Sequence, residues 1–135
     1  MQVKPGTAWI APGGRHMALK REGLRVTLEI HDDPAENSCR PAVDVLFRSV
    51  AEVYSNRALC LVLTGMGQDG ADGMLALRDA GAETIAEDER SCVVFGMPRE
   101  AIMLGAARHV VTLADMPARL AHCVQQRAHE PATPS

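Results

Sequence analysis

A glycine-rich loop between an apolar run and a short amphipathic segment limits the folds open to this chain more than any other part of its sequence. Residues 58–63 form an uninterrupted apolar run of strand length, which is typical of a strand covered on both faces of a parallel sheet. The loop LTGMGQDG (63–70) follows, and residues 74–80 then continue as a short helix that Gly81 can end. This order of strand, loop and helix predicts one repeating unit of an α/β protein.

Segments on the carboxyl side of this unit alternate in the same way. Two of them are predicted strands, at 83–86 and 109–113. Two others are predicted helices: one opens at Gly96-Met97-Pro98, and one is capped by Asp115. A helix beginning at Pro41 is predicted before the apolar run. Residues 93–95 form an apolar run that is too short to identify as a strand.

The amino-terminal part has a different periodicity. Apolar and polar residues alternate over 24–30, and residues 16–30 are predicted to form a hairpin that turns at 21–23. A further short strand is predicted at 7–11, and a polar loop at 31–40. The whole pattern predicts an α/β fold: a doubly wound, mostly parallel sheet with an N-terminal β-hairpin.

Composition excludes several classes of protein. With 135 residues, of which 47% are hydrophobic, the chain fits one domain. A net charge of -3 and a pI near 5.9 give no basic stripe for a phosphate backbone, so we expect no nucleic acid partner. No run approaches the roughly 18 apolar residues of a membrane span, so we expect a cytoplasmic protein without membrane insertion.

The four cysteines are far apart in the sequence. They form no C-x-x-C pair, so their spacing indicates neither a zinc site nor a disulfide framework. Cys60 lies within an apolar run, where a small buried thiol is the ordinary role. From these patterns we expect no metal and no cofactor.

The glycine loop admits two kinds of chemistry. Gly65, Gly67 and Gly70 match the G-x-G-x-x-G fingerprint of dinucleotide-binding folds, and Glu87 with Asp88 follows at about the offset of a ribose-binding carboxylate. Asp69 and Asp72, however, would compete with a pyrophosphate for the helix N-terminus and repel it. Repulsion from these two carboxylates makes dinucleotide binding the weaker hypothesis.

Asp69 itself has two interpretations. It can be a helix N-cap, which is a common structural role and also the simplest one for Asp72. Alternatively, it lies at the carboxyl edge of a central strand, where wound α/β sheets place their catalytic groups. A carboxylate held there can orient a histidine and stabilise the imidazolium that forms when a serine is deprotonated.

Two long motifs and three short ones carry a family resemblance. The long motifs are LTGMGQDG (63–70) and SCVVFGMPREA (91–101), and the short ones are IAPG (10–13), RHM (15–17) and RPAVDVLF (40–47). Together they closely resemble the bacterial chemotaxis protein-glutamate methylesterases of the CheB type. The resemblance extends from about residue 5 to about residue 111.

This resemblance implies an activity and a site. The family hydrolyses glutamate methyl esters, and deamidates glutamines, on the cytoplasmic domains of chemoreceptors through a Ser-His-Asp triad. Asp69 matches the triad aspartate, and Gly65, Met66 and Gly67 belong to the active-site loop. By the same resemblance, Met66 and Met97 are expected to line the ester pocket.

The chain departs from the family pattern in one respect. The family's serine lies in a G-A-S-T-G-G stretch and its histidine in a Q-H-M-P stretch, and neither stretch is present. His16 matches a family histidine outside the triad. We therefore expect the carboxyl-terminal part of the catalytic domain, truncated on its N-terminal side, with residues 1–127 as a partial domain and 128–135 as a flexible tail.

Three further expectations follow from that departure. The chain alone should be inactive or nearly so. The uncovered edges of its sheet favour self-association. The alternative function is a non-catalytic remnant or docking module of the chemotaxis system.

Overall fold

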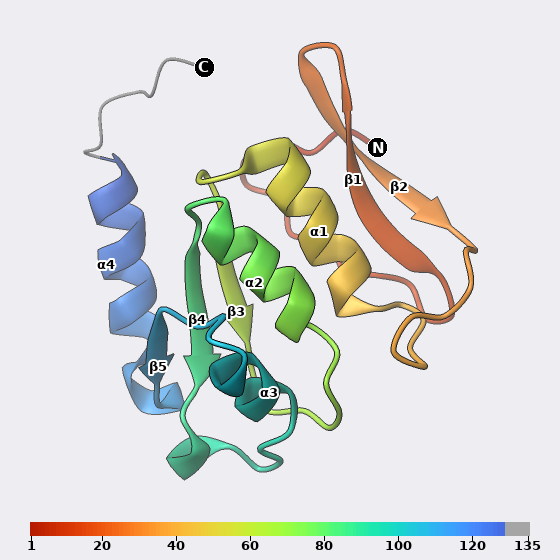
Figure 1. Cartoon of the computed structure of the whole chain (residues 1–135). Helices are drawn as coiled ribbons and strands as arrows, with labels where there is room; N and C mark the ends of the chain where they lie inside the picture. Colours follow the sequence, from red (N-terminus) through yellow and green to blue (C-terminus); the bar gives the residue numbers. More distant parts are fainter. Residues whose placement is uncertain (129–135) are drawn as a thin grey trace.

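Two separate sheets form the framework of the protein in a computed structural model that describes residues 1–128 (Figure 1). The first is an antiparallel hairpin of β1 (His16–Glu22) and β2 (Arg25–His31). The second is a parallel sheet in the order β3–β4–β5, made of Leu59–Val62, Glu83–Glu87 and His109–Val111. The predicted hairpin and parallel sheet are both confirmed.

Helices cover both faces of the parallel sheet. On one face lie α1 (Val43–Tyr54), α2 (Ala71–Asp79) and α3 (Met97–Met103), and their core includes the fully buried Met74 and Leu77. The other face packs against α4 (Met116–Ala128) through Ile85 and Cys123. Helices on both faces define the doubly wound arrangement that the alternating pattern predicted.

Helix α1 lies between the hairpin and α2 (Figure 1). The amide of Leu19 on β1 donates to the Ser49 hydroxyl of α1, so a partly buried hydrogen bond fastens the hairpin to the helix. This packing fixes the first turn of α1 beside the glycine loop.

Several predicted boundaries need correction. Residues 7–11 are not a strand. Residues 1–3 lie along β2 instead, where the Val3 amide donates to the Val26 carbonyl, so residues 7–11 have no ladder partner within the described chain. Residues 93–95 do not form a strand; Phe95 makes only an isolated bridge with Gly65. The hairpin turns at 23–24, slightly later than predicted.

Two helix ends also differ from the prediction. Helix α1 starts at Val43, after the N-cap residue Ala42, so Pro41 lies before the helix. Helix α4 follows Asp115 directly and continues through Arg127 to Ala128. The rest of the predicted tail, 129–135, lies outside the described residues.

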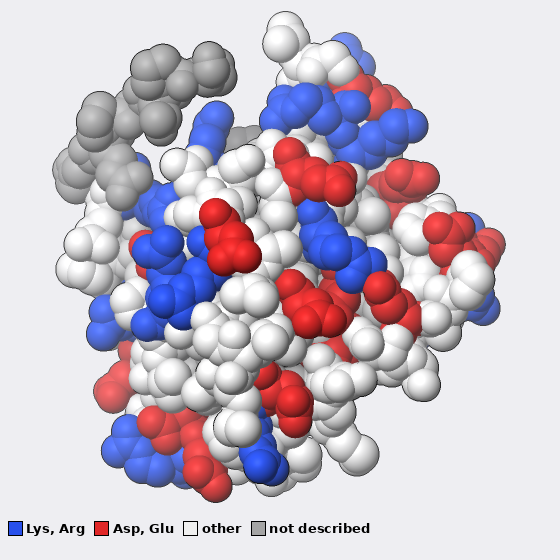
Figure 2. Space-filling view, in the orientation of Figure 1, with Lys and Arg blue, Asp and Glu red and all other residues white. Residues whose placement is uncertain are grey.

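The surface carries charges of both signs. On the face in Figure 2, basic and acidic side chains are interspersed and neither sign forms a continuous stripe. In the described part of the chain, every helix is too short or too polar to cross a bilayer.

Candidate active site

Asp69 lies in the loop between β3 and α2, at the carboxyl edge of the parallel sheet, and its residue is only 5% exposed. Its Oδ2 accepts a hydrogen bond from the Val43 amide at 2.6 Å, and its Oδ1 accepts one from the Asp44 amide at 3.1 Å. These two amides belong to the first turn of α1. The carboxylate therefore sits at the positive end of that helix, where the helix dipole stabilises its charge.

Asp44 makes the reciprocal contact. It is 2% exposed in the first turn of α1, and its Oδ1 accepts from the Gly73 amide in the first turn of α2 at 2.7 Å. Asp69 thus accepts two amides of α1, the helix that contains Asp44, and Asp44 accepts one amide of α2, the helix that follows Asp69. The arrangement fixes α1 and α2 relative to each other at their N-termini.

One side-chain amide bridges the two carboxylates. Asn37 Nδ2 donates to Asp44 Oδ2 at 2.7 Å and to Asp69 Oδ1 at 3.1 Å. Asn37 has a φ of 53°, a left-handed conformation that Asn adopts more readily than most residues. The bridge places a neutral donor between two anions that would otherwise repel each other.

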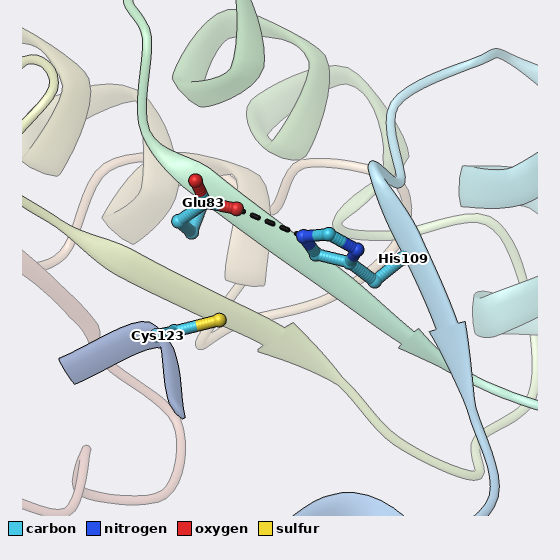
Figure 3. A group of neighbouring side chains, drawn as sticks. All are labelled: Glu83, His109 and Cys123. Carbon is cyan, nitrogen blue, oxygen red and sulfur yellow. Dashed lines mark hydrogen bonds and ion pairs between the residues drawn. The ribbon is translucent and has the colours of Figure 1, made fainter. Parts of the chain in front are cut away.

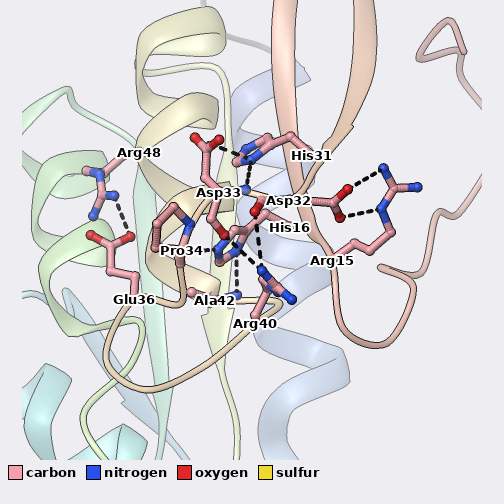
Figure 4. Close-up of polar contacts among 10 residues, drawn as sticks. All are labelled: Arg15, His16, His31, Asp32, Asp33, Pro34, Glu36, Arg40, Ala42 and Arg48. Carbon is pink, nitrogen blue, oxygen red and sulfur yellow. Dashed lines mark hydrogen bonds and ion pairs between the residues drawn. The ribbon is translucent and has the colours of Figure 1, made fainter.

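The loop of residues 31–40, which carries Asn37, is held by charged and polar contacts (Figure 4). Arg15 pairs with Asp32 at 2.7 Å, and this hydrogen bond lowers the pKa of the exposed Asp32 carboxyl. Arg48 of α1 pairs with Glu36 at 2.6 Å, a hydrogen bond that raises the pKa of Arg48. The start and the middle of the loop are therefore tied to residues outside it.

His16 has a structural role in the same region. Its residue is fully buried, Nδ1 accepts from the Ala42 amide at 3.2 Å, and Nε2 lies 3.0 Å from the Pro34 carbonyl (Figure 4). Since the amide must donate to Nδ1, the proton lies on Nε2 and points at Pro34. Both ring nitrogens are thus occupied, Nδ1 with the N-cap residue of α1 and Nε2 with the 31–40 loop.

The predicted active-site loop, Gly65, Met66 and Gly67, is fastened to the second long motif. The Gly65 amide donates to the Val94 carbonyl at 3.0 Å, and the Gly65 carbonyl accepts from the Met97 amide at 2.8 Å. A Cβ on Gly65 would lie 2.7 Å from the Met97 sulfur, so these segments pack without spare room. Met66 at the tip is 83% exposed, and Met97 is half-buried beneath the loop.

Glu87, at the end of β4, holds the start of the 63–70 loop by a hydrogen bond. Its residue is 1% exposed; one carboxylate oxygen accepts from the Thr64 amide at 2.9 Å and the other from the Ser91 hydroxyl at 2.8 Å. A charged group buried at the end of a strand needs such partners. Glu87 therefore links the 63–70 loop to the segment that follows β4.

This geometry contradicts the dinucleotide hypothesis. The Gly73 amide, which a phosphate would need at the N-terminus of α2, already donates to Asp44. Glu87 is buried and hydrogen-bonded, so it is not available to a ribose. The interpretation of Asp69 as the N-cap of α2 is also wrong. Gly70 occupies that N-cap position, where no side chain of its own can cap the helix, and Asp69 caps α1 instead.

Asp69 retains capacity for a further donor. An ionised carboxylate offers about four acceptor positions, and the hydrogen bonds described above use three, only one of them on Oδ2. Asn37, which is hydrogen-bonded to Asp69, and Gln68, which precedes Asp69 in the sequence, line a hollow of about 300 Å³. The Asp69 carboxylate does not line the hollow directly, because it faces α1.

Within residues 1–128, the hydrogen-bond partners of Asp69 include neither a serine nor a histidine. Ser49 and Ser91 are engaged elsewhere, the first with Leu46 in α1 and the second with Glu87. Of the histidines, His16 is occupied by backbone groups and His109 by Glu83 on the sheet. The described residues thus bring together the acidic group, the loop and their supports.

Sequence reasoning missed Asn37 and Asp44 as members of the site. Asp44 had a usable signal, because it is an acidic residue in the first turn of an apolar helix. Asn37 lies in a polar loop, and no local pattern marks it.

The fold and this site define a wound α/β protein with a buried, helix-capping carboxylate at the carboxyl edge of its parallel sheet. Comparison with known proteins gives the family. Residues 1–120 match the model of the CheB methylesterase family, and the chain belongs to that family.

Individual relatives agree with this assignment. A protein-glutamate methylesterase/protein-glutamine glutaminase of Photobacterium profundum is 52% identical over 123 residues, which are 91% of this chain and 35% of the relative. The protein of the same name from Escherichia coli K12 is 57% identical over 115 residues, or 85% of this chain and 33% of the relative. The chain therefore spans about a third of the length of these curated relatives.

A solved structure supports the fold. The crystal structure of the Thermotoga maritima CheB methylesterase catalytic domain superposes with a TM-score of 0.85 at 39% sequence identity. The match covers 89% of this chain and 64% of that domain.

Proposed function

We propose that this chain supplies the acidic member of a Ser-His-Asp triad for the hydrolysis of protein-glutamate methyl esters and the deamidation of protein glutamines. Asp69 is the acidic member, and the substrates are the methylated cytoplasmic domains of chemoreceptors. The observation that carries the proposal is the buried Asp69 carboxylate, which two α1 amides and Asn37 hold in one orientation at the carboxyl edge of the sheet.

In this mechanism, Asp69 acts on the histidine and not on the ester. Its Oδ2 accepts the Nδ1 proton of an imidazole, which fixes the tautomer and leaves Nε2 free to take a proton from a serine hydroxyl. The carboxylate then stabilises the imidazolium while the serine attacks the ester carbonyl. Because helix amides already fix the carboxylate, little reorganisation accompanies that step.

The serine and the histidine come from outside these 135 residues. Without a nucleophile and a base, the chain alone releases no methanol from a methylated receptor. We assign the exposed Met66, in the loop that carries Asp69, and the half-buried Met97, which packs against that loop, to the pocket for the ester methyl group.

A chimera tests the proposal. Residues 1–120 of this chain replace the matching segment of the Escherichia coli relative, which supplies the remainder of its own sequence. The chimera should release methanol from methylated receptor, and Asp69→Asn should lower kcat by about 10⁴-fold, because the imidazole then adopts the wrong tautomer.

Asp79→Asn is the matched control, since Asp79 is exposed at the last position of α2, does not line the hollow beside Asp69 and should leave kcat unchanged. The proposal fails if Asp69→Asn retains the activity of the parent chimera, or if the unmodified chain hydrolyses the ester by itself. Receptor binding by the isolated chain, together with an inactive parent chimera, would instead favour a docking module.

A further inference from the structure

Three side chains on the α4 face of the parallel sheet converge far from Asp69. Glu83 begins β4, His109 begins β5 and Cys123 lies in α4 (Figure 3). A carboxylate oxygen, a ring nitrogen and the sulfur of this trio all lie within 4.8 Å of one another. Their positions in the sequence are too far apart to form a spacing motif, and packing of α4 on the sheet brings them together.

These three atom types form a ligand set that zinc prefers. Thiolate sulfur, imidazole nitrogen and carboxylate oxygen bind Zn²⁺ at about 2.3, 2.0 and 2.1 Å, so tetrahedral ligands lie about 3.3–3.8 Å apart. The Glu83 and His109 atoms are 3.0 Å apart and hydrogen-bonded (Figure 3). They would separate slightly, and the sulfur would approach by about 1 Å or less, to reach that geometry.

Burial differs across the trio in a way that suits a bound ion. Cys123 is 3% exposed, whereas the His109 and Glu83 side chains are 31% and 18% exposed. The sulfur thus closes the site on the inner side, and the outer side is accessible to solvent. Three protein ligands then leave a fourth tetrahedral position that a water molecule can fill.

Arg127 does not prevent metal binding, because the two oxygens of the Glu83 carboxylate face different partners. Oε1 lies 3.4 Å from Arg127, and Oε2 is the oxygen that faces His109. Arg127 also donates to the backbone carbonyls of Asn56 and Gly81, so its position is fixed independently of Glu83. A hydrogen-bonded partner behind a ligating carboxylate is the usual second layer of a metal site.

We propose that Glu83 Oε2, His109 Nε2 and Cys123 Sγ form a zinc-binding site that fastens α4 to the edge of the sheet. The thiolate and the carboxylate together neutralise the charge of the dication. This inference does not depend on the proposed triad.

Metal titration of the full chain tests the site. Chain stripped with a chelator is titrated with Zn²⁺ against a chromophoric competitor, and with Co²⁺ while the absorption spectrum is recorded. We expect one equivalent to bind, a thiolate-to-cobalt charge-transfer band, and a melting temperature that rises with Zn²⁺. Cys123→Ser should abolish the band, and Glu83→Gln and His109→Gln should each weaken zinc binding about tenfold or more.

Two matched variants serve as controls. His122→Gln changes an exposed histidine of the same helix, and Cys39→Ser removes a half-buried free thiol of the 31–40 loop; both should retain the band and the affinity. Far-UV circular dichroism confirms that each variant is folded. The inference is overturned if the chain binds less than one equivalent at micromolar zinc, or if Cys123→Ser, Glu83→Gln and His109→Gln bind as the parent does.

Discussion

At the scale of single residues, Asp44 and Asp69 exchange helix caps across the site. Both carboxylates are buried; Asp69 accepts two amides of the first turn of α1, Asp44 accepts the Gly73 amide of α2, and Asn37 donates to both. The same hydrogen bonds that stabilise the fold also aim Asp69. Catalytic orientation and stability are therefore coupled through shared donors.

Asp44→Ala tests the structural half of this coupling. It leaves the buried Gly73 amide without an acceptor, so we expect the free energy of unfolding to fall by about 1–3 kcal/mol. Urea denaturation measures the change. Asp72→Ala is the control, because Asp72 is an exposed acidic residue in the same turn of α2 as Gly73. It should change the free energy of unfolding by less than about 0.5 kcal/mol, and an equal loss in both variants would refute the role of Asp44.

Cys60 gives a pH-dependent prediction. Burial raises the pKa of its thiol from 9.0 to about 12. Between those two pH values Cys60 ionises in the unfolded chain but stays protonated in the native chain. The free energy of unfolding therefore falls as pH rises above 9, by up to about 1.4 kcal/mol per pH unit. The slope of unfolding free energy against pH between 9 and 10.5 should be shallower in Cys60→Ala than in the parent; identical slopes would rule this out.

Sequence reasoning at this scale reached Asp69 but not its partners. The residue follows an apolar strand and lies in a glycine loop, which is enough to place it at the carboxyl edge of a sheet. Its bonds to Val43 and Asp44 depend on how α1 packs beside α2, some 25 residues away. No local periodicity encodes that contact.

At the scale of elements, close packing of α1 on α2 positions the site. A Cβ on Gly73 would lie 2.6 Å from the Phe47 Cβ and 2.9 Å from Asp44 Oδ1, so the two helices meet without clearance. Gly70, with a φ of 97°, turns the chain into α2 directly before this contact. Glycine at both positions allows the two N-termini to approach.

Gly73→Ala should therefore force the helices apart. We expect a loss of about 1–3 kcal/mol in unfolding free energy, the typical cost of overpacking, measured by urea denaturation. Gly13→Ala is the control, because a Cβ at Gly13 meets nothing within 4 Å. If Gly73→Ala were as stable as the parent, the close approach of α1 and α2 would not be a determinant of this fold.

Elements with a strong local pattern were predicted well. The hairpin, β3 and α2 follow from periodicity and turn residues, and the weaker pattern at 83–86 also forms a strand, β4. The strand predicted at 7–11 failed for a physical reason, because a strand requires a partner and residues 1–3 occupy the edge of β2 instead. Strand pairing is a tertiary property that alternation alone does not specify.

At the scale of the whole molecule, the parallel sheet has an open edge. Within the described residues, β3 pairs only with β4, so the backbone groups on its other side have no strand partner. Leu59 and Leu61 make this edge apolar on the α4 face. Such an edge is a template for pairing with another chain.

We therefore expect the chain to self-associate through β3. Sedimentation velocity over a wide range of concentrations should show a growing fraction of dimers or larger species. A single monomeric species at every concentration would contradict the role of the open edge.

The most direct test of the central claim is to compare kcat of the Asp69→Asn and Asp44→Ala chimeras, both measured at a temperature where each is folded. If Asp69 aims an imidazole, its variant loses about 10⁴-fold in kcat while the Asp44 variant keeps most of its activity despite reduced stability. If the Asp69→Asn chimera retains the activity of the parent chimera, Asp69 serves only as a helix cap and does not orient an imidazole.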